Sequence, residues 1–256
     1  MPPIGVTPAD LAPFGTAWAV DSALPRTRPY SSSQLGNIFD TAVGGALATM
    51  LGGIPIVRPN ARRLVASERD CVEVGPVRII GGVRPQNFDV GYRPDGVRFA
   101  FDSKTLNDTK SVGKNWQNMI NDLATEATTV HSRFPHAVVA FMVIIPTPCL
   151  SSSRRLAMIE TLERLSRRVG VSDPDYMAEA ISFVLWEPGD GSISDVFPSM
   201  ESPLRFEKFS SFVEAAYVSR YKGLPPHAGA EEEDEAAEEE IAAAEGIAEA
   251  RAIEEK

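Results

Sequence analysis

Hydrophobic positions in the middle of the chain alternate with a period of two and then merge into one continuous apolar run. Alternation predicts strands, because side chains along a strand point to its two faces in turn. The continuous run lies between Pro135 and Pro146 and predicts a strand covered on both faces. The predicted strands cover residues 71–80, 87–92, 97–105, 137–145 and 180–186.

Apolar residues at intervals of three and four predict helices around these strands. The predicted helices cover residues 60–69, 114–134, 206–221 and a segment from Ser151 to Gly170. Residues 35–57 form the longest apolar stretch, but Asn37, Asp40 and Pro55 would be costly inside lipid. We therefore expect a small-residue helix buried in the protein core and no membrane span.

The order of these elements predicts an α/β fold with a mixed central sheet sandwiched by helices. Residues 1–30 contain six prolines and no regular apolar period, so we expect an irregular, proline-rich arm. Residues 31–224 form the predicted domain. Residues 225–256 are almost purely Glu and Ala and form a predicted acidic tail.

The net charge of −10 belongs to that tail. Residues 231–256 hold twelve acidic and two basic side chains, which leaves 23 acidic residues of 35 and 23 basic residues of 25 for the body. A neutral body does not exclude nucleic acid, because phosphate attraction is local at physiological salt. The tail is either a solubilising extension or a DNA mimic that covers a basic cleft, and the sequence leaves both interpretations open.

The two cysteines, Cys71 and Cys149, lack the spacing of a zinc site or a disulfide framework. We expect both to be buried, reduced thiols. The N-terminus has no basic stretch followed by an apolar run, so we expect no secretory signal and a cytoplasmic protein.

Acidic and basic residues share one face of a predicted hairpin. The turn at residues 93–96, Arg-Pro-Asp-Gly, joins two strands, and alternation places Asp102 and Lys104 on the same face of the second strand. Folding the hairpin sets Asp89 across from residue 100 or 101, which is roughly 5–8 Å from Asp102. Two neighbouring carboxylates repel each other, and a hard cation would relieve that cost.

Magnesium prefers oxygen ligands and keeps several waters. Asp89, Asp102 and a backbone carbonyl, that of Ser103, could hold Mg²⁺ and leave room for water and a phosphate oxygen, with Mn²⁺ as a substitute. Lys104 could position or help deprotonate the attacking water and offset charge in the transition state. A solvated cross-strand ion pair between Asp102 and Lys104 is the plainer interpretation, and it does not account for Asp89.

These residues resemble the PD-(D/E)xK, or restriction-endonuclease-like, nucleases over roughly residues 61–146. That resemblance implies a core of a helix, a meander of strands, a helix and a further strand, with metal bound by an acid on the second strand and by a (D/E)-x-K triplet on the third. Asp89 matches the first acid and Asp102-Ser103-Lys104 the triplet, although Phe88 replaces the usual proline. The resemblance also implies a helix glutamate, for which we expect Glu68, with Glu73 as the second choice.

Basic residues at two predicted helix starts suggest contacts to the DNA backbone, because helix N-termini favour phosphate. We expect these contacts from Lys110, Lys114, Arg154 and Arg155. A basic face on the second helix would be extended by Arg164, Arg167 and Arg168, and Gln117 is a further candidate near the site.

The resemblance implies a Mg²⁺-dependent DNA endonuclease of a restriction or other host-defence system. It would be a homodimer if it cuts both strands, and a companion methyltransferase would be a partner. A non-catalytic DNA- or protein-binding module that keeps the nuclease fold is the alternative. A third hypothesis is an unrelated α/β interaction protein whose acidic tail recruits a basic partner.

Overall fold

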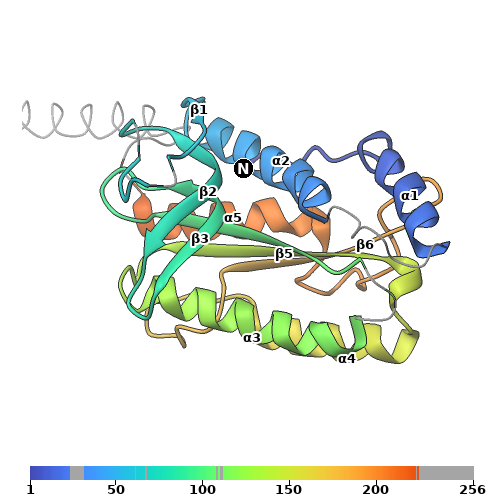
Figure 1. Ribbon diagram of the computed structural model, residues 1–256. Helices are drawn as coiled ribbons and strands as arrows, with labels where there is room; N and C mark the ends of the chain where they lie inside the picture. The colour runs from blue at the N-terminus through green and yellow to red at the C-terminus, as the bar shows by residue number, and fades with distance from the viewer. Residues whose placement is uncertain are drawn as a thin grey trace, which may run out of the picture.

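The computed structural model of the chain describes residues 1–23, 32–60, 62–66, 68–107, 109, 112–222 and 224. In this part of the chain a six-stranded sheet lies between two layers of helices (Figure 1). The strands are β1 (Ile56–Val57), β2 (Val72–Ile80), β3 (Pro85–Tyr92), β4 (Phe99–Thr105), β5 (Val138–Pro146) and β6 (Ala180–Trp186). The expected mixed α/β class is confirmed.

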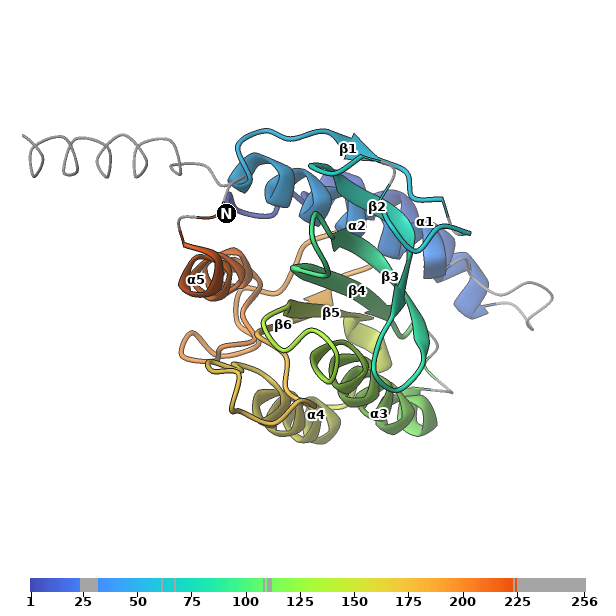
Figure 2. The same ribbon diagram turned by 90° about the vertical axis from the view of Figure 1, so that its left-hand side faces the viewer.

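Five α-helices flank the sheet within the described residues. They are α1 (Pro8–Ala23), α2 (Ser32–Met50), α3 (Val112–His131), α4 (Ser152–Leu165) and α5 (Phe209–Tyr221), with short 3₁₀ turns at Thr147–Cys149 and Phe206–Lys208. Helices α1, α2 and α5 cover one face of the sheet, and α3 and α4 cover the other (Figures 1 and 2). None of the helices in the described part of the chain is long and apolar enough to span a membrane.

The strands lie in the sheet in their order along the chain. Strands β2, β3 and β4 form an antiparallel meander, while β4, β5 and β6 run parallel and β1 joins β2 in parallel. A parallel pair needs a crossover, and α3 and α4 provide the two crossovers on the same side of the sheet. The sheet is therefore mixed, with the meander at one end and the parallel strands at the other.

Each face of the sheet packs into its own core. On the side of α1, α2 and α5, Phe99 and Phe101 of β4 are fully buried, and on the side of α3 and α4, Ala100 is buried. This alternation along β4 is the one that the sequence predicts. Every residue of β5 and β6 is buried, as expected of parallel strands covered on both faces.

The N-terminal arm is not irregular over its whole length. Residues Pro8–Ala23 form α1, so that prediction is wrong for this segment. Asp10 Oδ2 accepts hydrogen bonds from the backbone N–H of Thr7, 2.8 Å, and from its hydroxyl, 2.6 Å, a cap that starts the helix with Pro8 in its first turn. Pro8 costs no hydrogen bond there, and buried Leu11 anchors the helix to the core.

The predicted helix over residues 60–69 is also wrong, because the described residues of this segment form turns. Asn60 Oδ1 accepts a bond from the backbone N–H of Arg62, 3.0 Å, and the Asn60 carbonyl accepts one from Arg63, 2.8 Å. Leu64 and Val65 are exposed, and two apolar residues cannot form a stripe that holds a helix against the core. The helix that precedes the meander is α2.

Other predictions agree with the structure. The remaining strands and helices form within a few residues of their expected bounds, and the stretch from Leu35 forms the buried helix α2. Cys71 and Cys149 are buried, reduced thiols. Gly96 has a φ of +133° in the hairpin turn between β3 and β4. The acidic tail, residues 225–256, lies outside the described residues.

Helix α2 lies unusually close to the sheet because one of its faces has glycines. A Cβ on Gly44 would stand 2.3 Å from Val74 Cγ2, and a Cβ on Gly36 would stand 2.9 Å from Ser103 Oγ. Asp40 lies midway between these glycines on the same face, since helix residues four apart are neighbours. The glycines therefore bring Asp40 against β4.

We predict opposite effects for two adjacent substitutions in α2. Gly44→Ala should destabilise the protein by about 1–2 kcal/mol, because the clash with Val74 outweighs the gain in helix propensity. Gly45→Ala meets nothing within 4 Å and should stabilise it by about 0.5–1 kcal/mol. Urea unfolding of both variants measures the difference, and equal free energies of unfolding would contradict the close approach.

Candidate active site

A β-bulge in β2 opens the sheet beside Asp89. Val74 pairs with Val90 and Val77 pairs with Phe88, so Asp89 faces the two residues Gly75 and Pro76. Gly75 has a φ of +127°, a backbone conformation that glycine adopts without strain. A bulge of this kind turns the facing side chain out of the regular ladder, and here it aims Asp89 at β4.

Asp89 contacts the triplet on β4 directly. Continuing the ladder by one residue from Val90 and Phe101 brings Asp89 opposite Asp102. The sequence predicts residue 100 or 101 as the partner of Asp89. The observed pairing is shifted because Tyr92 and Phe99 are the last paired residues, so the loop between the strands runs from residue 93 to 98. Asp89 Oδ2 accepts hydrogen bonds from the backbone N–H of Ser103, 3.0 Å, and from its hydroxyl, 3.2 Å.

Lys104 lies between two carboxylates on the α3 side of the sheet. Its ammonium group donates to Asp102 Oδ2 and to Glu126 Oε1 of α3, the latter at 2.8 Å. Gln86 Nε2 of β3 donates to the same Glu126 oxygen, also at 2.8 Å. Burial favours the neutral amine, but the two carboxylates outweigh it and raise the pKa of Lys104. Lys104 is therefore a fixed positive charge.

Asp40 of α2 completes a cluster of three aspartates. Its side chain is 5% exposed, and its Oδ1 atom is buried with no hydrogen-bond partner among the described residues. The sequence analysis assigns no site role to Asp40 or Glu126. Each is an acid on an otherwise apolar helix face, Asp40 beside Phe39 and Glu126 beside Ala127, and that position was the available signal.

Burial raises the pKa of all three aspartates above the ordinary value of 3.8, and a neighbouring aspartate adds to the increase for Asp40 and Asp89. Desolvation and the charge of Asp89 raise the pKa of Asp40 to about 8, and the Ser103 hydroxyl offsets part of this. Desolvation and a hydrogen bond shared with Asp102 raise the pKa of Asp89 to about 7. Desolvation raises the pKa of Asp102 to about 6, although Asp89 and Lys104 lower it.

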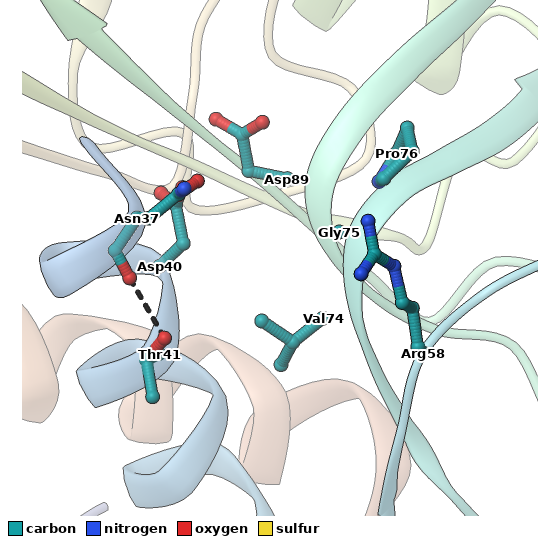
Figure 3. Close-up of a pocket in the computed structure, with 8 residues that line it drawn as sticks. All are labelled: Asn37, Asp40, Thr41, Arg58, Val74, Gly75, Pro76 and Asp89. Carbon is teal, nitrogen blue, oxygen red and sulfur yellow. Dashed lines mark hydrogen bonds between the residues drawn. The ribbon is translucent and has the colours of Figure 1, made fainter. Parts of the chain in front are cut away.

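A pocket of about 370 Å³ opens on the α2 side of this cluster (Figure 3). Asp40 and Asp89 point into it from opposite elements, and Arg58 lies on the wall formed by the bulge. The lining residues are Asn37, Asp40, Thr41, Arg58, Val74, Gly75, Pro76 and Asp89. The pocket is polar and open to solvent, which suits a charged ligand.

The residues present fit a divalent cation. The negative charge of the three aspartates, two buried and one partly buried, exceeds the positive charge in contact with them among the described residues. In addition, Asp40 Oδ1 is an acceptor with no partner among the described residues. No group of three or more His, Cys, Asp or Glu in the described part of the chain is arranged to surround a metal ion. The fit is therefore to a pair of carboxylates, which is the usual protein contribution to a Mg²⁺ site that keeps its waters.

The glutamates expected from the sequence lie elsewhere. Glu68 is exposed in the loop before β2 and does not line the pocket, and its carbonyl accepts a bond from Cys71 Sγ at 3.2 Å. Glu73 is buried in a bidentate ion pair with Arg93, at 2.6 and 2.8 Å. Asp40 is the acid that the helix before the meander brings to Asp89.

The expected DNA-binding residues divide into three groups. Lys114 is exposed in the first turn of α3, and the Arg154 guanidinium lies against neighbouring Gly113, so these two residues meet at one helix start. Arg155 donates to the Thr147 carbonyl at 3.2 Å and stacks on Phe197. Lys110 lies outside the described residues.

The predicted basic face of α4 is smaller than expected. Arg168 is fully buried, and it donates to the Pro135 carbonyl and to Glu179 of a buried ion network. Its inclusion in an exposed face was wrong, because it lies beyond the end of α4 and turns inward. Arg164 and Arg167 are exposed, and Gln117 is exposed on α3.

The aspartate cluster predicts a pH-dependent stability that divalent cations reverse. Folded-state pKa values raised above 3.8 mean that the folded protein binds protons more tightly than the unfolded chain. The contribution of the cluster to stability is therefore full below about pH 4 and is lost as the pH rises through about 6 to 8. A bound cation replaces those protons.

We expect Mg²⁺ or Mn²⁺, at about a hundredfold excess over its Kd, to raise the melting temperature by roughly 5–10 °C at pH 8. The increase should be much smaller at pH 5, where protons compete. Differential scanning calorimetry of Asp40→Asn and Asp89→Asn should give a reduced increase, while the exposed Asp70→Asn control keeps it. An equal increase in all four proteins would mean that the cation binds elsewhere.

We found no match to this chain among protein-family models, curated proteins or solved structures. Its function is therefore inferred from the geometry of the site.

Proposed function

We propose that this chain is a divalent-metal-dependent nuclease that hydrolyses phosphodiester bonds in DNA. The observation that carries the proposal is the meeting of Asp89, Asp102 and Lys104 on neighbouring strands, where a bulge opens the sheet and a second buried acid, Asp40, arrives from α2. Perturbed carboxylates in a polar pocket are typical of catalytic sites.

The topology supports the resemblance to the PD-(D/E)xK nucleases. Helix α2, the meander β2–β3–β4, helix α3 and the parallel strand β5 follow one another in the order that the resemblance implies. Asp89 lies on the second strand of this meander and the triplet on the third. A restriction-endonuclease-like core is therefore part of the proposal, with α2 as its first helix.

Each residue of the site has a role that follows from its surroundings. Asp89 and Asp102 would hold a divalent cation, and Asp40 would orient a water molecule. When bound, the cation would polarise the phosphate and lower the pKa of a coordinated water. Lys104 is held protonated by Asp102 and Glu126, so its role is to offset negative charge in the transition state, and it is not a general base.

Basic residues beside the site support a nucleic-acid substrate. Lys114 and Arg154 lie together at the first turn of α3, directly after the chain leaves the triplet strand. A helix start with two cations is suited to a backbone phosphate. The expectations of a restriction or host-defence role, a homodimer and a companion methyltransferase stay predictions.

A non-catalytic binding module that keeps this fold is the second candidate. The observation in its favour is the buried ion group of Lys104 with Asp102 and Glu126, which could exist for structure alone. Such a group does not require buried Asp40 and partly buried Asp89 to lie beside it. Cleavage distinguishes the two candidates.

We predict that Asp102→Asn and Lys104→Met each lower the rate of Mg²⁺-dependent DNA cleavage by at least about 10²-fold, the usual cost of losing a group that acts on the transition state. The substrates are supercoiled plasmid and unmethylated phage DNA, each with Mg²⁺, with Mn²⁺ and with EDTA. Gel analysis under single-turnover conditions gives the rate.

Asp70→Asn is the matched control, since it removes one exposed carboxylate without touching the site. Circular dichroism should show that all variants fold. Cleavage that persists in EDTA or in Asp102→Asn would contradict the assignment. DNA binding by the wild-type protein without cleavage of any substrate would favour the binding module.

A further inference from the structure

Arg58 is a positively charged residue that lines the pocket beside the aspartate cluster, and none of the roles proposed above involves it. It follows the two-residue edge strand β1 and is exposed at the mouth of the pocket that Asp40 and Asp89 line. Figure 3 shows its side chain rising along the wall formed by Gly75 and Pro76, across the pocket from Asn37 and Asp40.

The β-bulge that aims Asp89 also makes room for Arg58. A Cβ on Gly75 would stand 3.3 Å from Pro59 Cδ and 3.9 Å from Arg58 Cγ, so the Arg58 stem passes over a residue with no side chain. β1 is held in parallel to the start of β2, which fixes the chain just before Arg58. One local distortion of β2 therefore places an acid and a guanidinium in the same pocket.

Arg58 does not neutralise the acids that it faces. Among the described residues it forms no ion pair within 4.0 Å, although two aspartates line the same pocket and their pKa values are raised to about 8 and about 7. If Arg58 served only a structural ion pair with Asp40 or Asp89, the side chains would be in contact, since all three line one pocket. The pocket of about 370 Å³ instead leaves room for a ligand that contacts a guanidinium on one side and acidic residues on the other.

We propose that Arg58 binds a non-bridging oxygen of the substrate phosphate and so holds the nucleic-acid strand over the aspartates. A phosphodiester meets both walls of the pocket, because its anionic oxygens accept hydrogen bonds from a guanidinium and also bind the divalent cation that the acids favour. The inference rests on the proposed function and extends it to a substrate-binding residue. Arg58 acts on binding, whereas Asp102 and Lys104 act on cleavage.

The test measures DNA binding in Ca²⁺ by fluorescence anisotropy of a labelled 30-base-pair duplex, with cleavage in Mg²⁺ measured separately. Arg58→Ala should weaken binding by about tenfold, which is typical of a lost charge-assisted phosphate contact. The dependence of log Kd on log salt should lose about one phosphate contact. Arg58→Lys should recover part of the affinity but not all of it, because an ammonium cannot donate a bidentate pair.

The control is Arg84→Ala, which removes the same charge from an exposed position in the turn between β2 and β3 that does not line the pocket. It should change neither Kd nor the salt slope. Melting temperatures of all variants should match the wild type, since Arg58 is exposed and unpaired among the described residues.

Two failures are distinguishable. If the wild type binds and cleaves DNA but Arg58→Ala has the affinity and salt slope of Arg84→Ala, the role of Arg58 is overturned and the nuclease assignment stands. If the wild type neither binds nor cleaves DNA, the proposed function fails. Binding that Arg58→Ala weakens, without cleavage by the wild type, would keep the phosphate contact and remove the nuclease.

Discussion

The gathering of three aspartates at one point of the sheet, two of them buried and Asp89 partly buried, is the constraint on which the site depends. Water would stabilise each carboxylate, and its exclusion raises the pKa of Asp40, Asp89 and Asp102 together. Among the described residues one positive charge is in direct contact with the cluster, that of Lys104, and it is shared with Glu126. The negative charge that Lys104 does not compensate can be neutralised by protons at low pH or by a divalent cation at neutral pH.

The surrounding fold prevents the three aspartates from moving apart, so the electrostatic cost of their proximity remains. Glycines on one face of α2 hold Asp40 against β4, and the bulge at Gly75 keeps Asp89 turned toward Ser103. Both elements are fixed by apolar packing on either side, with Phe39 and Val43 buried below α2 and Phe88 and Val90 beside Asp89. Apolar packing in the two hydrophobic cores therefore offsets the electrostatic cost of the aspartate cluster.

The sequence allowed the hairpin and its triplet to be predicted because both depend on local pattern. Two-residue alternation separates Asp102 and Lys104 from Phe101, and the turn with Gly96 joins the strands. The exact register could not be read, because it depends on how many residues the turn leaves unpaired. The alternation of side chains indicates on which face of a strand a residue lies, but it does not indicate where the pairing between two strands ends.

Contacts between distant segments were beyond the same reasoning. Asp40 reaches Asp89 only through the packing of α2 on the sheet, and the short apolar pair Leu64 and Val65 drew the prediction toward a helix that does not form. Helix α1 was missed because its prolines obscured a start that Thr7 and Asp10 cap. In each case tertiary packing or capping decided the outcome over local periodicity.

The closeness in sequence of Asp89 and Ser103, 14 residues apart, also bears on how the site assembles during folding. Lys104 and Glu126 are 22 residues apart, so hairpin closure and the docking of α3 bring four charged groups together at a small loss of loop entropy. Asp40 belongs to α2, outside this unit, and reaches the cluster through the packing of α2 on the meander. The segment from β3 to α3 thus contains most of the charged cluster, and α2 supplies the acid that encloses it on the other face of the sheet.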